Sequence, residues 1–503
     1  MMAPLYIRAD AGPAMGTGHV MRCLALAREW QRLGGEVLFL SRIDVPALRE
    51  RIVAEGFRLV SPDDLASENG EASSVAAWLA AQGGKGWLAL DGYHFGTDYQ
   101  RRLRASGQRV LVIDDDALLP EYCCDLLLNQ NLHARELAYP DAAAATLLLG
   151  PRYALLRREF RGGHGEKEPQ PAVARKILLT MGGSDPANAT PAILAALAES
   201  GMDGLEVVAL AGPANPHREH LAALAATLPF RCEVREAAAE MAPLMRWADA
   251  AIAAAGTTSY ELAAMGLPFL AVVVADNQRR NAAGLAAHGI AGVLGEWGMI
   301  APNELAVGIA SFLRDQGQRQ AQAVAGRQLV DGLGASRVVT AMLARDVRLR
   351  PVCPQDEELL LRWANDPETR ANSFCGEAIA PAEHARWLAT KLAAEECVMY
   401  LAEDATGTPC GVARFEMVQG RGVISVGIAP EFRRQGLGSR IIRAACERVF
   451  AERALREIEA LVKVENLGSL TAFSKAGFQV GSATARNGMP AMSLHCEPEA
   501  RHG

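Results

Sequence analysis

The sequence predicts an α/β protein with two parallel sheets, followed by a smaller α+β domain. Short apolar runs alternate with amphipathic stretches through the first two thirds of the chain, the pattern of strands wrapped by helices. A polar stretch rich in Gly and Pro at residues 161–172 reads as a linker, after which the pattern restarts. Near Asp346 the pattern changes again. We therefore expect domains at residues 1–162, 173–345 and 346–500.

Eight apolar runs are the strands expected in the two parallel sheets, four on each side of the linker. Two such doubly wound domains form a cleft where their strands end. After the change near Asp346, VRLRPV is expected as a strand, and GVARFEMV and GVISVGIA as a hairpin with the turn QGRG. The eight runs are Leu5–Ala9, Val37–Leu40, Trp87–Asp91, Val110–Asp114, Lys176–Met181, Val207–Ala211, Ala250–Ala254 and Phe269–Ala275.

Composition limits the classes of partner and compartment. The net charge of −7 and the pI near 5.9 argue against nucleic acid or an anionic membrane as the main partner, because both attract basic faces. The chain starts without a basic and apolar leader, and no apolar run reaches the roughly 18 residues that span a bilayer. A cytoplasmic protein is expected. The ten cysteines form no CxxC pair, so neither a zinc site nor a disulfide framework is indicated.

The most informative motif is GTGHVMR at Gly16–Arg22, directly after the first expected strand. Gly16 and Gly18 let the backbone approach a ligand, and the helix expected from Val20 directs N–H groups and a positive dipole end toward an anion. His19 then faces whatever binds at the carboxyl edge of the sheet. The alternative is an ordinary turn in which the imidazole caps the helix.

A second glycine turn, MGGSDPAN, opens the second domain. Backbone amides of Gly182, Gly183 and Ser184 could hold a phosphate, although the same residues make a common strand-to-helix turn.

A third constellation is AAGTTSYELAAMGLP. Gly256 and Thr257 end a strand of small residues, and the hydroxyl of Thr258 follows. Glu261, in the first turn of the next helix, could accept both hydroxyls of a ribose or serve only to cap the helix. The next strand ends at the same edge with Asp276, Asn277 and Gln278. Amides, hydroxyls and a carboxylate at one edge indicate a nucleotide-sugar site.

Taken in order from Leu5 to Val339, these motifs resemble the UDP-2,4-diacetamido-2,4,6-trideoxy-β-L-altropyranose hydrolases of pseudaminic acid biosynthesis. The resemblance implies a GT-B-like pair of Rossmann-type domains with UDP held mainly by the second. It also implies His19 as the catalytic residue, Tyr93 and Asn277 as sugar-side partners and Glu261 as the ribose ligand. Gly16, Gly18, Arg22 and Gln278 are further residues expected to bind the substrate or UDP. The motifs are GTGHVMRCLALA, DGY, VIDDD, DLLLNQN, LLGPRYALLRREF, MGGSDPAN, GTTSYELAAMGLP and DNQ.

Hydrolysis suits these residue types. UDP is a good leaving group, so the reaction needs a positioned water, a base near neutral pKa and donors for the diphosphate. Histidine supplies such a base, and helix N-termini supply the donors, so no metal is expected. His94 could compete for the role of base, but it lies outside the glycine turn and reads more readily as a solvated loop residue.

The third domain carries an independent motif, VGIAPEFRRQGLGSRIIRAACERVF. It resembles the Q/RxxGxG/A loop of the GNAT acetyltransferases, and NLGSLTAFSKAGF resembles their downstream helix. The segments LRWANDPETRANSF and AEHARW resemble the first helices of amino-sugar acetyltransferases. The resemblance implies acetyl-CoA as co-substrate, its pyrophosphate bound by loop amides at a helix N-terminus. The expected acetyl-CoA residues are Ile428, Arg433, Arg434, Gly436, Leu437, Gly438, Ser439 and Asn466.

The acid and base of this domain stay open. Many GNAT enzymes have a tyrosine acid seven residues after the asparagine, but here the position is Phe473. Glu416 and Glu459 are candidate bases toward a sugar ammonium, or ordinary strand carboxylates. His384 is a third candidate, or a helix-surface histidine.

The sequence therefore predicts a bifunctional enzyme acting on UDP-amino sugars. The third domain N-acetylates a UDP-linked 4-amino sugar, and the first two domains hydrolyse the product. One alternative is a GT-B glycosyltransferase that passes the sugar to an acceptor. Another is a nucleotide-sugar-sensing module fused to a protein acetyltransferase, against which the intact His19 and the full set of cleft motifs argue.

Overall fold

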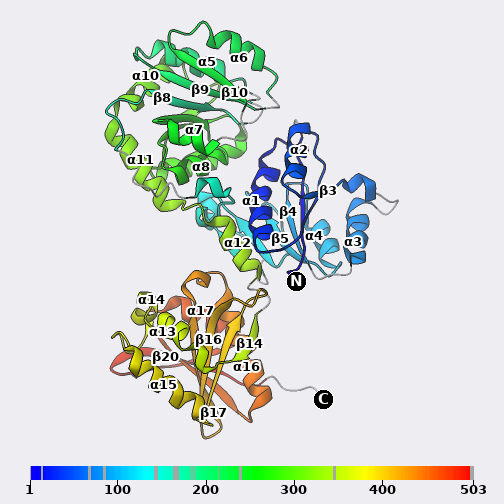
Figure 1. Cartoon of the computed structure of the whole chain (residues 1–503), viewed down its shortest axis with the longest axis vertical. Helices are drawn as coiled ribbons and strands as arrows, with labels where there is room; N and C mark the ends of the chain where they lie inside the picture. Colours follow the sequence, from blue (N-terminus) through cyan, green and yellow to red (C-terminus); the bar gives the residue numbers. More distant parts are fainter. Residues whose placement is uncertain are drawn as a thin grey trace. The chain divides into compact units, whose positions relative to one another are not determined.

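The structure is a computed structural model with two compact units, Met1–Val338 and Val339–Gly503 (Figure 1). It describes residues 2–12, 15–65, 70–82, 86–140, 145–161, 169–182, 185, 187–212, 215–236, 241–343 and 347–498. Most of the expected linker, residues 162–168, lies outside this range. The first unit contains two parallel sheets, and the second contains a mixed sheet.

The first sheet has seven parallel strands in the order β3-β2-β1-β4-β5-β6-β7. The order reverses between β1 and β4, and such a switch point opens a crevice at the carboxyl ends of the strands. The strands are β1 (Leu5–Ala9), β2 (Val37–Leu40), β3 (Arg58–Val60), β4 (Trp87–Asp91), β5 (Arg109–Ile113), β6 (Leu126–Asn129) and β7 (Thr146–Leu149). The helices are α1 (Gly18–Arg32), α2 (Pro46–Ala54), α3 (Glu71–Ala81) and α4 (Thr97–Arg104).

Apolar residues on α1 explain how it packs on this sheet. Val20, Leu24, Ala27 and Trp30 are fully buried, and their spacing of three or four residues places them along one side of the helix. This packing holds the first turn of α1 at the carboxyl end of β1.

The second sheet has six parallel strands in the order β10-β9-β8-β11-β12-β13, with its switch point between β8 and β11. Its strands are β8 (Lys176–Thr180), β9 (Glu206–Ala211), β10 (Arg231–Glu236), β11 (Ala250–Ala254), β12 (Phe269–Val273) and β13 (Ala291–Glu296). The helices are α5 (Thr190–Glu199), α6 (Arg218–Ala225), α7 (Met241–Trp247), α8 (Thr258–Met265), α9 (Arg279–Ala287), α10 (Pro302–Arg314), α11 (Gln316–Leu329) and α12 (Gly334–Leu343).

Side chains from both halves of the first unit share one core. Leu132, Leu156 and Phe160 pack in the same buried cluster as Tyr260 and residues of β11 and β12. The backbone N–H of Leu132 donates to Tyr260 Oη at 3.2 Å. The short 3-10 helices η2 (Leu132–Glu136) and η6 (Asp276–Gln278) both adjoin α9 in this region.

The second unit is a seven-stranded mixed sheet in the order β14-β15-β16-β17-β18-β20-β19. Only β17 and β18 pair in parallel among its neighbouring described strands. The strands are β14 (Arg348–Pro351), β15 (Cys397–Glu403), β16 (Pro409–Val418), β17 (Arg421–Ile428), β18 (Glu457–Lys463), β19 (Gln479–Arg486) and β20 (Met489–Cys496). The helices are α13 (Glu357–Ala364), α14 (Pro367–Asn372), α15 (Pro381–Ala393), α16 (Leu437–Glu452) and α17 (Leu467–Lys475).

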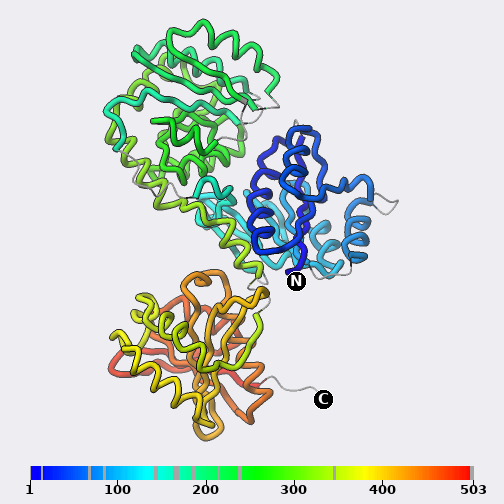
Figure 2. Tube along the Cα trace, in the orientation of Figure 1, coloured from blue at the N-terminus to red at the C-terminus, as the bar shows by residue number. Residues whose placement is uncertain are grey.

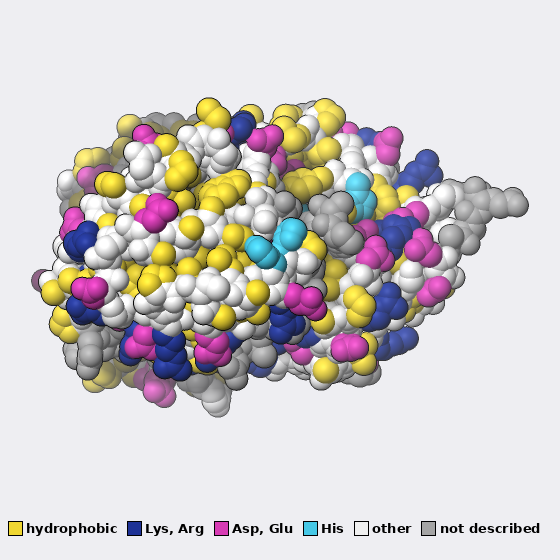
Figure 3. Space-filling view, turned by 90° about the horizontal axis from the view of Figure 1, so that it is seen from above, with side chains coloured by type: hydrophobic (Ala, Val, Ile, Leu, Met, Phe, Trp, Pro, Cys, Tyr) yellow, Lys and Arg dark blue, Asp and Glu magenta, His cyan; other side chains and the backbone are white. Residues whose placement is uncertain are grey.

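The structure contains the eight expected strands of the first unit and the expected hairpin, β16 and β17. It adds strands that the apolar runs did not reveal, such as β10, whose sequence RCEVRE alternates charged and apolar residues at a sheet edge. The first helix begins at Gly18, two residues earlier than expected. Figure 2 traces the chain through both sheets of the first unit and then into the second unit. On the face drawn in Figure 3, acidic and basic side chains are interspersed.

Candidate functional site

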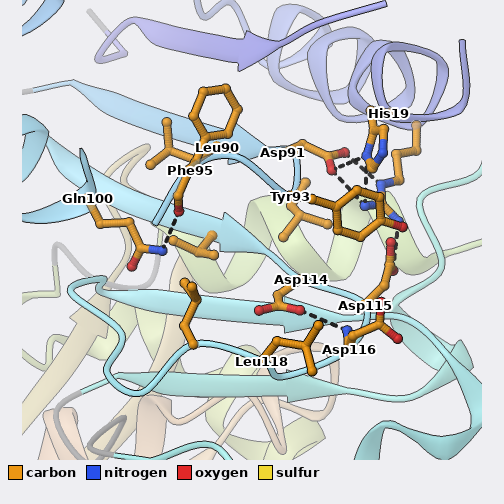
Figure 4. Close-up of a pocket in the computed structure, with 15 residues that line it drawn as sticks. His19, Leu90, Asp91, Tyr93, Phe95, Gln100, Asp114, Asp115, Asp116 and Leu118 are labelled. Atoms are coloured by element: carbon orange, nitrogen blue, oxygen red, sulfur yellow. Dashed lines mark hydrogen bonds and ion pairs between the residues drawn. The ribbon is translucent and has the colours of Figure 1, made fainter. Parts of the chain in front are cut away.

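The switch point of the first sheet brings His19 beside Asp91. β1 and β4 are neighbours, with Ala9 opposite Asp91, and the chain turns at Gly16 (φ 77°) before α1 begins at Gly18. His19 lies in the first turn of α1 and is 9% exposed. Its Nδ1 lies 2.6 Å from Asp91 Oδ1 (Figure 4). The expected histidine thus has a buried carboxylate partner.

Arg22, one turn further along α1, binds the same carboxylate. It donates from Nε to Asp91 Oδ2 and from Nη2 to Asp91 Oδ1, both at 2.6 Å. A third bond runs from Nη1 to Asp115 Oδ1 at 2.9 Å. Burial disfavours the ionised carboxyl, but the charges of Arg22 and His19 prevail and hold the pKa of Asp91 well below its usual range. Asp91 is therefore an anion at neutral pH.

These contacts select one tautomer of the His19 imidazole. An ionised carboxylate can only accept, so Nδ1 carries the proton that it donates to Asp91. Arg22 Nη2 also lies 3.3 Å from Nδ1, but it donates to the nearer Asp91 oxygen. In the neutral ring the lone pair is then on Nε2, which can accept a proton.

Tyr93 and Asn277 come from opposite halves of the first unit and meet in this region. The Tyr93 ring packs edge-on against His19, with centroids 5.2 Å apart, and the tyrosine is 57% exposed. Burial of the phenol and the charge of Asp115 raise the pKa of Tyr93, while a hydrogen bond with Asn277 opposes this rise. The two residues that the resemblance assigned to the sugar side are therefore in contact.

A cavity of about 180 Å³ collects most of the expected first-unit site residues. Its walls combine loops after β1 and β4 with the N-terminus of α8 and the loop before α9. The first turns of α1 and α8 have backbone N–H groups without a partner inside the helix, and these favour an anion at this end of each helix. Eight expected residues line it: Gly18, His19, Arg22, Tyr93, Gly256, Thr257, Asn277 and Gln278.

Other expected residues lie outside the lining of this cavity. Glu261 faces Arg157, with Oε1 3.7 Å from the guanidinium, and burial raises the pKa of its carboxyl to about 7 despite Arg157. His94 lies 3.2 Å from Asp10 through Nε2. Gly16, Gly182 and Thr258 are also not among the lining residues, and Gly183 and Ser184 lie outside the described residues.

The cavity contains five polar residues to which the motifs assigned no role. They follow β5 and β6, or lie on α9, and so reach the same edge of the first unit. Tracts of polar residues directly after two apolar strands, in VIDDD and LLLNQN, were the available signal. The residues are Asp115, Asp116, Asn131, His133 and Asn281.

A smaller cavity of about 80 Å³ adjoins the first and shares five lining residues with it, His19, Arg22, Tyr93, Asp115 and Asp116 (Figure 4). Its remaining wall is largely apolar. Leu90, Phe95, Val112, Ile113, Leu118 and Leu119 contribute to this wall.

In the second unit, the expected acetyl-CoA loop precedes α16. Gly436 has φ 76° and caps this sixteen-residue helix, and a Cβ at Gly438 would approach Ala472 Cβ to 3.5 Å. Such a bare helix N-terminus fits a pyrophosphate, because its first N–H groups have no partner within the helix. Leu437 is buried in the core beneath the loop, and the Ser439 hydroxyl donates to the Gly436 carbonyl.

Three other expected acetyl-CoA residues make contacts within the protein. Arg433 Nη2 lies 2.6 Å from Asp366 Oδ1, and its Nε donates to the Ile428 carbonyl at 3.2 Å. Asn466 caps α17 by accepting from the Ser469 N–H at 3.0 Å. Arg434 has φ 61°, and its Nη2 lies 3.8 Å from Glu368 Oε1 although the side chain is 71% exposed. Their binding to acetyl-CoA stays a prediction.

The candidate bases of the second unit differ in environment. Glu416 lies 2.8 Å from Lys391 Nζ, and this ammonium lowers the pKa of Glu416, which weakens it as a base. Glu459 is on β18, in register with Val423. His384 is only 2% exposed and packs near Trp387, so a helix-surface position is wrong because this face of α15 turns into the core. Phe473 is likewise buried.

Two features are absent from the described residues. These residues contain no group of three or more His, Cys, Asp or Glu side chains arranged to hold a metal ion. In the same ranges, every helix is too short or too polar to cross a membrane.

Two protein families match parts of the chain. Residues 177–329 match the Glycosyltransferase family 28 C-terminal domain, and residues 346–479 match the Acetyltransferase (GNAT) domain. With the sheet topologies, these matches confirm the predicted fold class, a GT-B-like pair of Rossmann-type domains followed by a GNAT domain. The acetyltransferase domain supports the prediction that the chain is an enzyme.

Two curated relatives match part of the chain. Spore coat polysaccharide biosynthesis protein SpsG of Bacillus subtilis is 31% identical over 195 residues, or 39% of this chain and 57% of SpsG. An uncharacterized protein of Methanocaldococcus jannaschii is 24% identical over 283 residues, or 55% of this chain and 56% of the relative. The chain thus spans little more than half the length of either relative.

Two solved structures cover different shares of the chain. The match to MurG of Acinetobacter baumannii covers 67% of this chain and 98% of the MurG chain, at 18% identity and a TM-score of 0.48. The match to the aminoglycoside acetyltransferase AAC(6')-Ib, in complex with paromomycin and acetyl-CoA, covers 30% of this chain and 93% of that chain, at 22% identity and a TM-score of 0.28.

Proposed function

We propose that the first unit hydrolyses UDP-2,4-diacetamido-2,4,6-trideoxy-β-L-altropyranose to the free sugar and UDP, as a step of pseudaminic acid biosynthesis. The observation that carries this proposal is the His19–Asp91 pair, with Nδ1 and Oδ1 2.6 Å apart. His19 lines the cavity of about 180 Å³ together with Gly256, Thr257 and Asn277. The match to a family 28 glycosyltransferase domain and the name of SpsG support a nucleotide-sugar substrate.

In the proposed reaction, His19 Nε2 takes a proton from water as the water oxygen attacks the anomeric carbon. The bond from that carbon to the phosphate oxygen breaks, and its electron pair leaves with UDP. Asp91 keeps the reactive nitrogen free and stabilises the imidazolium that forms. Backbone N–H groups at the starts of α1 and α8 stabilise the charge that develops on the diphosphate.

We also propose that the second unit acetylates the 4-amino group of the preceding UDP-amino sugar. The free amine attacks the thioester carbonyl of acetyl-CoA, the C–S bond breaks, and CoA leaves as its thiol while a base takes the proton that the amine gives up. The loop before α16, with Gly436 and Gly438, would hold the pyrophosphate of acetyl-CoA. Because Glu416 is paired with Lys391, Glu459 and His384 remain the other candidate bases.

A glycosyltransferase that passes the sugar to an acceptor is a second candidate, favoured by the family 28 match. Purified protein should be incubated with the UDP-diacetamido sugar in buffer alone, and UDP and sugar followed by mass spectrometry. Free sugar formed in step with UDP supports hydrolysis, and oxygen from labelled water should enter the sugar. UDP released only after an acceptor is added would support the transferase instead.

A further inference from the structure

His133 is a buried histidine in the cleft without an internal hydrogen bond. It lies on η2 and is 9% exposed, and neither Nδ1 nor Nε2 has a hydrogen-bond partner within the described structure. It lines the cavity of about 180 Å³ together with Asp116. Since buried polar groups are normally paired, an unpaired, buried imidazole on a residue that lines a cavity suggests a ligand as its partner.

Most other polar side chains around His133 are already engaged. Asn131 donates to Asp115 Oδ1 at 2.7 Å, and Asp115 also accepts from Arg22. Asn281 donates to the Ala255 carbonyl at 2.8 Å and accepts from the Tyr260 hydroxyl at 2.6 Å. These groups shape the wall and have little capacity left for a ligand.

Asp116 differs from these neighbours. Its backbone N–H donates to Asp114 Oδ1, which fixes the turn, but no hydrogen bond or ion pair among the described residues engages its carboxylate. Burial and the charges of Asp115 and Asp114 raise the pKa of Asp116. The residue lines both adjoining cavities, the larger one together with His133 and the smaller one together with Leu90, Phe95 and Leu118 (Figure 4).

We propose that His133 and Asp116 form a subsite for one acetamido group of the sugar. The His133 ring donates to the acetamido carbonyl, Asp116 accepts from the amide N–H, and the methyl group enters the smaller, apolar cavity. This inference rests on the proposed function, since it identifies how the hydrolase distinguishes its acetylated substrate.

A free amine fits this subsite poorly. An ammonium has three donors and no acceptor, so it cannot use the His133 N–H. Asp115 already forms an ion pair with Arg22, and the positive charge of Arg280 partly neutralises Asp116. Both arginines reduce the attraction of the site for an ammonium. An ammonium also brings no methyl group to the apolar wall. The same pair therefore favours the acetylated sugar over its precursor.

The test measures dissociation constants by calorimetry with full-length protein carrying His19→Ala, so that the ligand is not consumed. The probes are the UDP-diacetamido sugar, the UDP-4-amino sugar and UDP. We expect the parent to prefer the diacetamido sugar roughly 10- to 100-fold, the effect of one or two specific hydrogen bonds. Adding His133→Phe or Asp116→Leu should bring this preference close to one.

UDP affinity reports whether each variant is folded and should not change. Asp116 follows β5 and His133 lies on η2, so either variant tests the subsite if the other misfolds. His288→Leu is the control, because His288 is exposed and bonds only to the Gly284 carbonyl among the described residues. An unchanged preference in both variants, or no preference in the parent, overturns the subsite.

Wild-type turnover, measured separately, distinguishes this inference from the proposed function. If the variants lose the preference but the wild type releases no UDP, the subsite stands and hydrolysis fails. If the wild type hydrolyses the sugar but the variants keep the preference, hydrolysis stands and the subsite is wrong.

Discussion

Asp91 accepts a hydrogen bond from His19 Nδ1 at 2.6 Å, although the two residues are 72 positions apart in the chain. The parallel pairing of β1 and β4 brings them together, because Ala9 and Asp91 end their strands side by side. This carboxylate orients the ring for proton transfer through Nε2, as in the triads of hydrolases.

The first prediction concerns His19 as the base. His19→Ala should lower kcat for hydrolysis roughly 100-fold or more, while the dissociation constant for UDP changes little. Steady-state kinetics and calorimetry measure the two effects. His94→Ala is the comparison, because His94 contacts Asp10 outside the cavity lining. Near-normal turnover by the His19 variant would remove His19 from the mechanism.

The sequence predicted His19 more fully than its surroundings. A glycine turn after an apolar strand places the histidine at a sheet edge by local rules alone. Asp91, Asp115 and His133 instead reach the site because β4, β5 and β6 end at the same edge, and strand order is a long-range property. The buried position of His384 was missed for a similar reason, since its burial depends on what packs against α15.

The second prediction concerns acid stability. Because the pKa of Asp91 is depressed in the folded protein, its ionised form stabilises the fold above the unfolded value of about 3.9, and this contribution is lost as the pH falls further. Asp91→Asn should lower stability at neutral pH and weaken its acid dependence. Chemical denaturation between pH 7 and pH 3 measures both. An equally steep acid dependence in the variant would contradict the assignment to Asp91.

The third prediction concerns Glu261 as a ribose ligand. Its pKa is raised to about 7, so the carboxylate that would accept the ribose hydroxyls forms as the pH rises through that value. UDP-sugar binding to the His19→Ala protein should strengthen from pH 6 to pH 8, and Glu261→Gln should remove this dependence and raise KM in the active enzyme. An unchanged KM would show that Glu261 does not bind the ribose, and would leave helix capping as its role.

The same raised pKa has the opposite consequence for stability without ligand. A carboxyl with a raised folded pKa stabilises the fold in its protonated form, and that contribution is lost as the pH rises toward 7. Glu261→Gln, which mimics the neutral acid, should therefore be relatively more stable than the wild type at pH 8 than at pH 5. Melting temperatures at the two pH values provide the comparison.

The fourth prediction is that hydrolysis needs no metal ion. Helix N-termini and the paired His19 supply the donors and the base that the reaction requires. UDP release should continue after dialysis against EDTA. Loss of activity that magnesium restores would show that a metal takes part.

The fifth prediction separates the two activities. Replacing Gly436 and Gly438 by valine should stop acetylation, because Gly436 has φ 76° and side chains there would cover the amides at the start of α16. Hydrolysis of the pre-acetylated sugar should continue at the wild-type rate, since the cleft belongs to the other unit. Gly407→Val is a matched control for backbone strain, because Gly407 has φ 84° and lies in the turn between β15 and β16.

The wild-type enzyme and the glycine variant also test the order of the two steps. Wild-type enzyme given the UDP-4-amino sugar and acetyl-CoA should release the free diacetamido sugar, and without acetyl-CoA it should release little sugar. The glycine variant should behave like the wild type without acetyl-CoA. Equal hydrolysis of the unacetylated amine would refute this order. If no acetyl transfer to the amine occurs, the second unit must use another acceptor. The buried Phe473, which stands where many GNAT enzymes have a tyrosine acid, would then be the first residue to test.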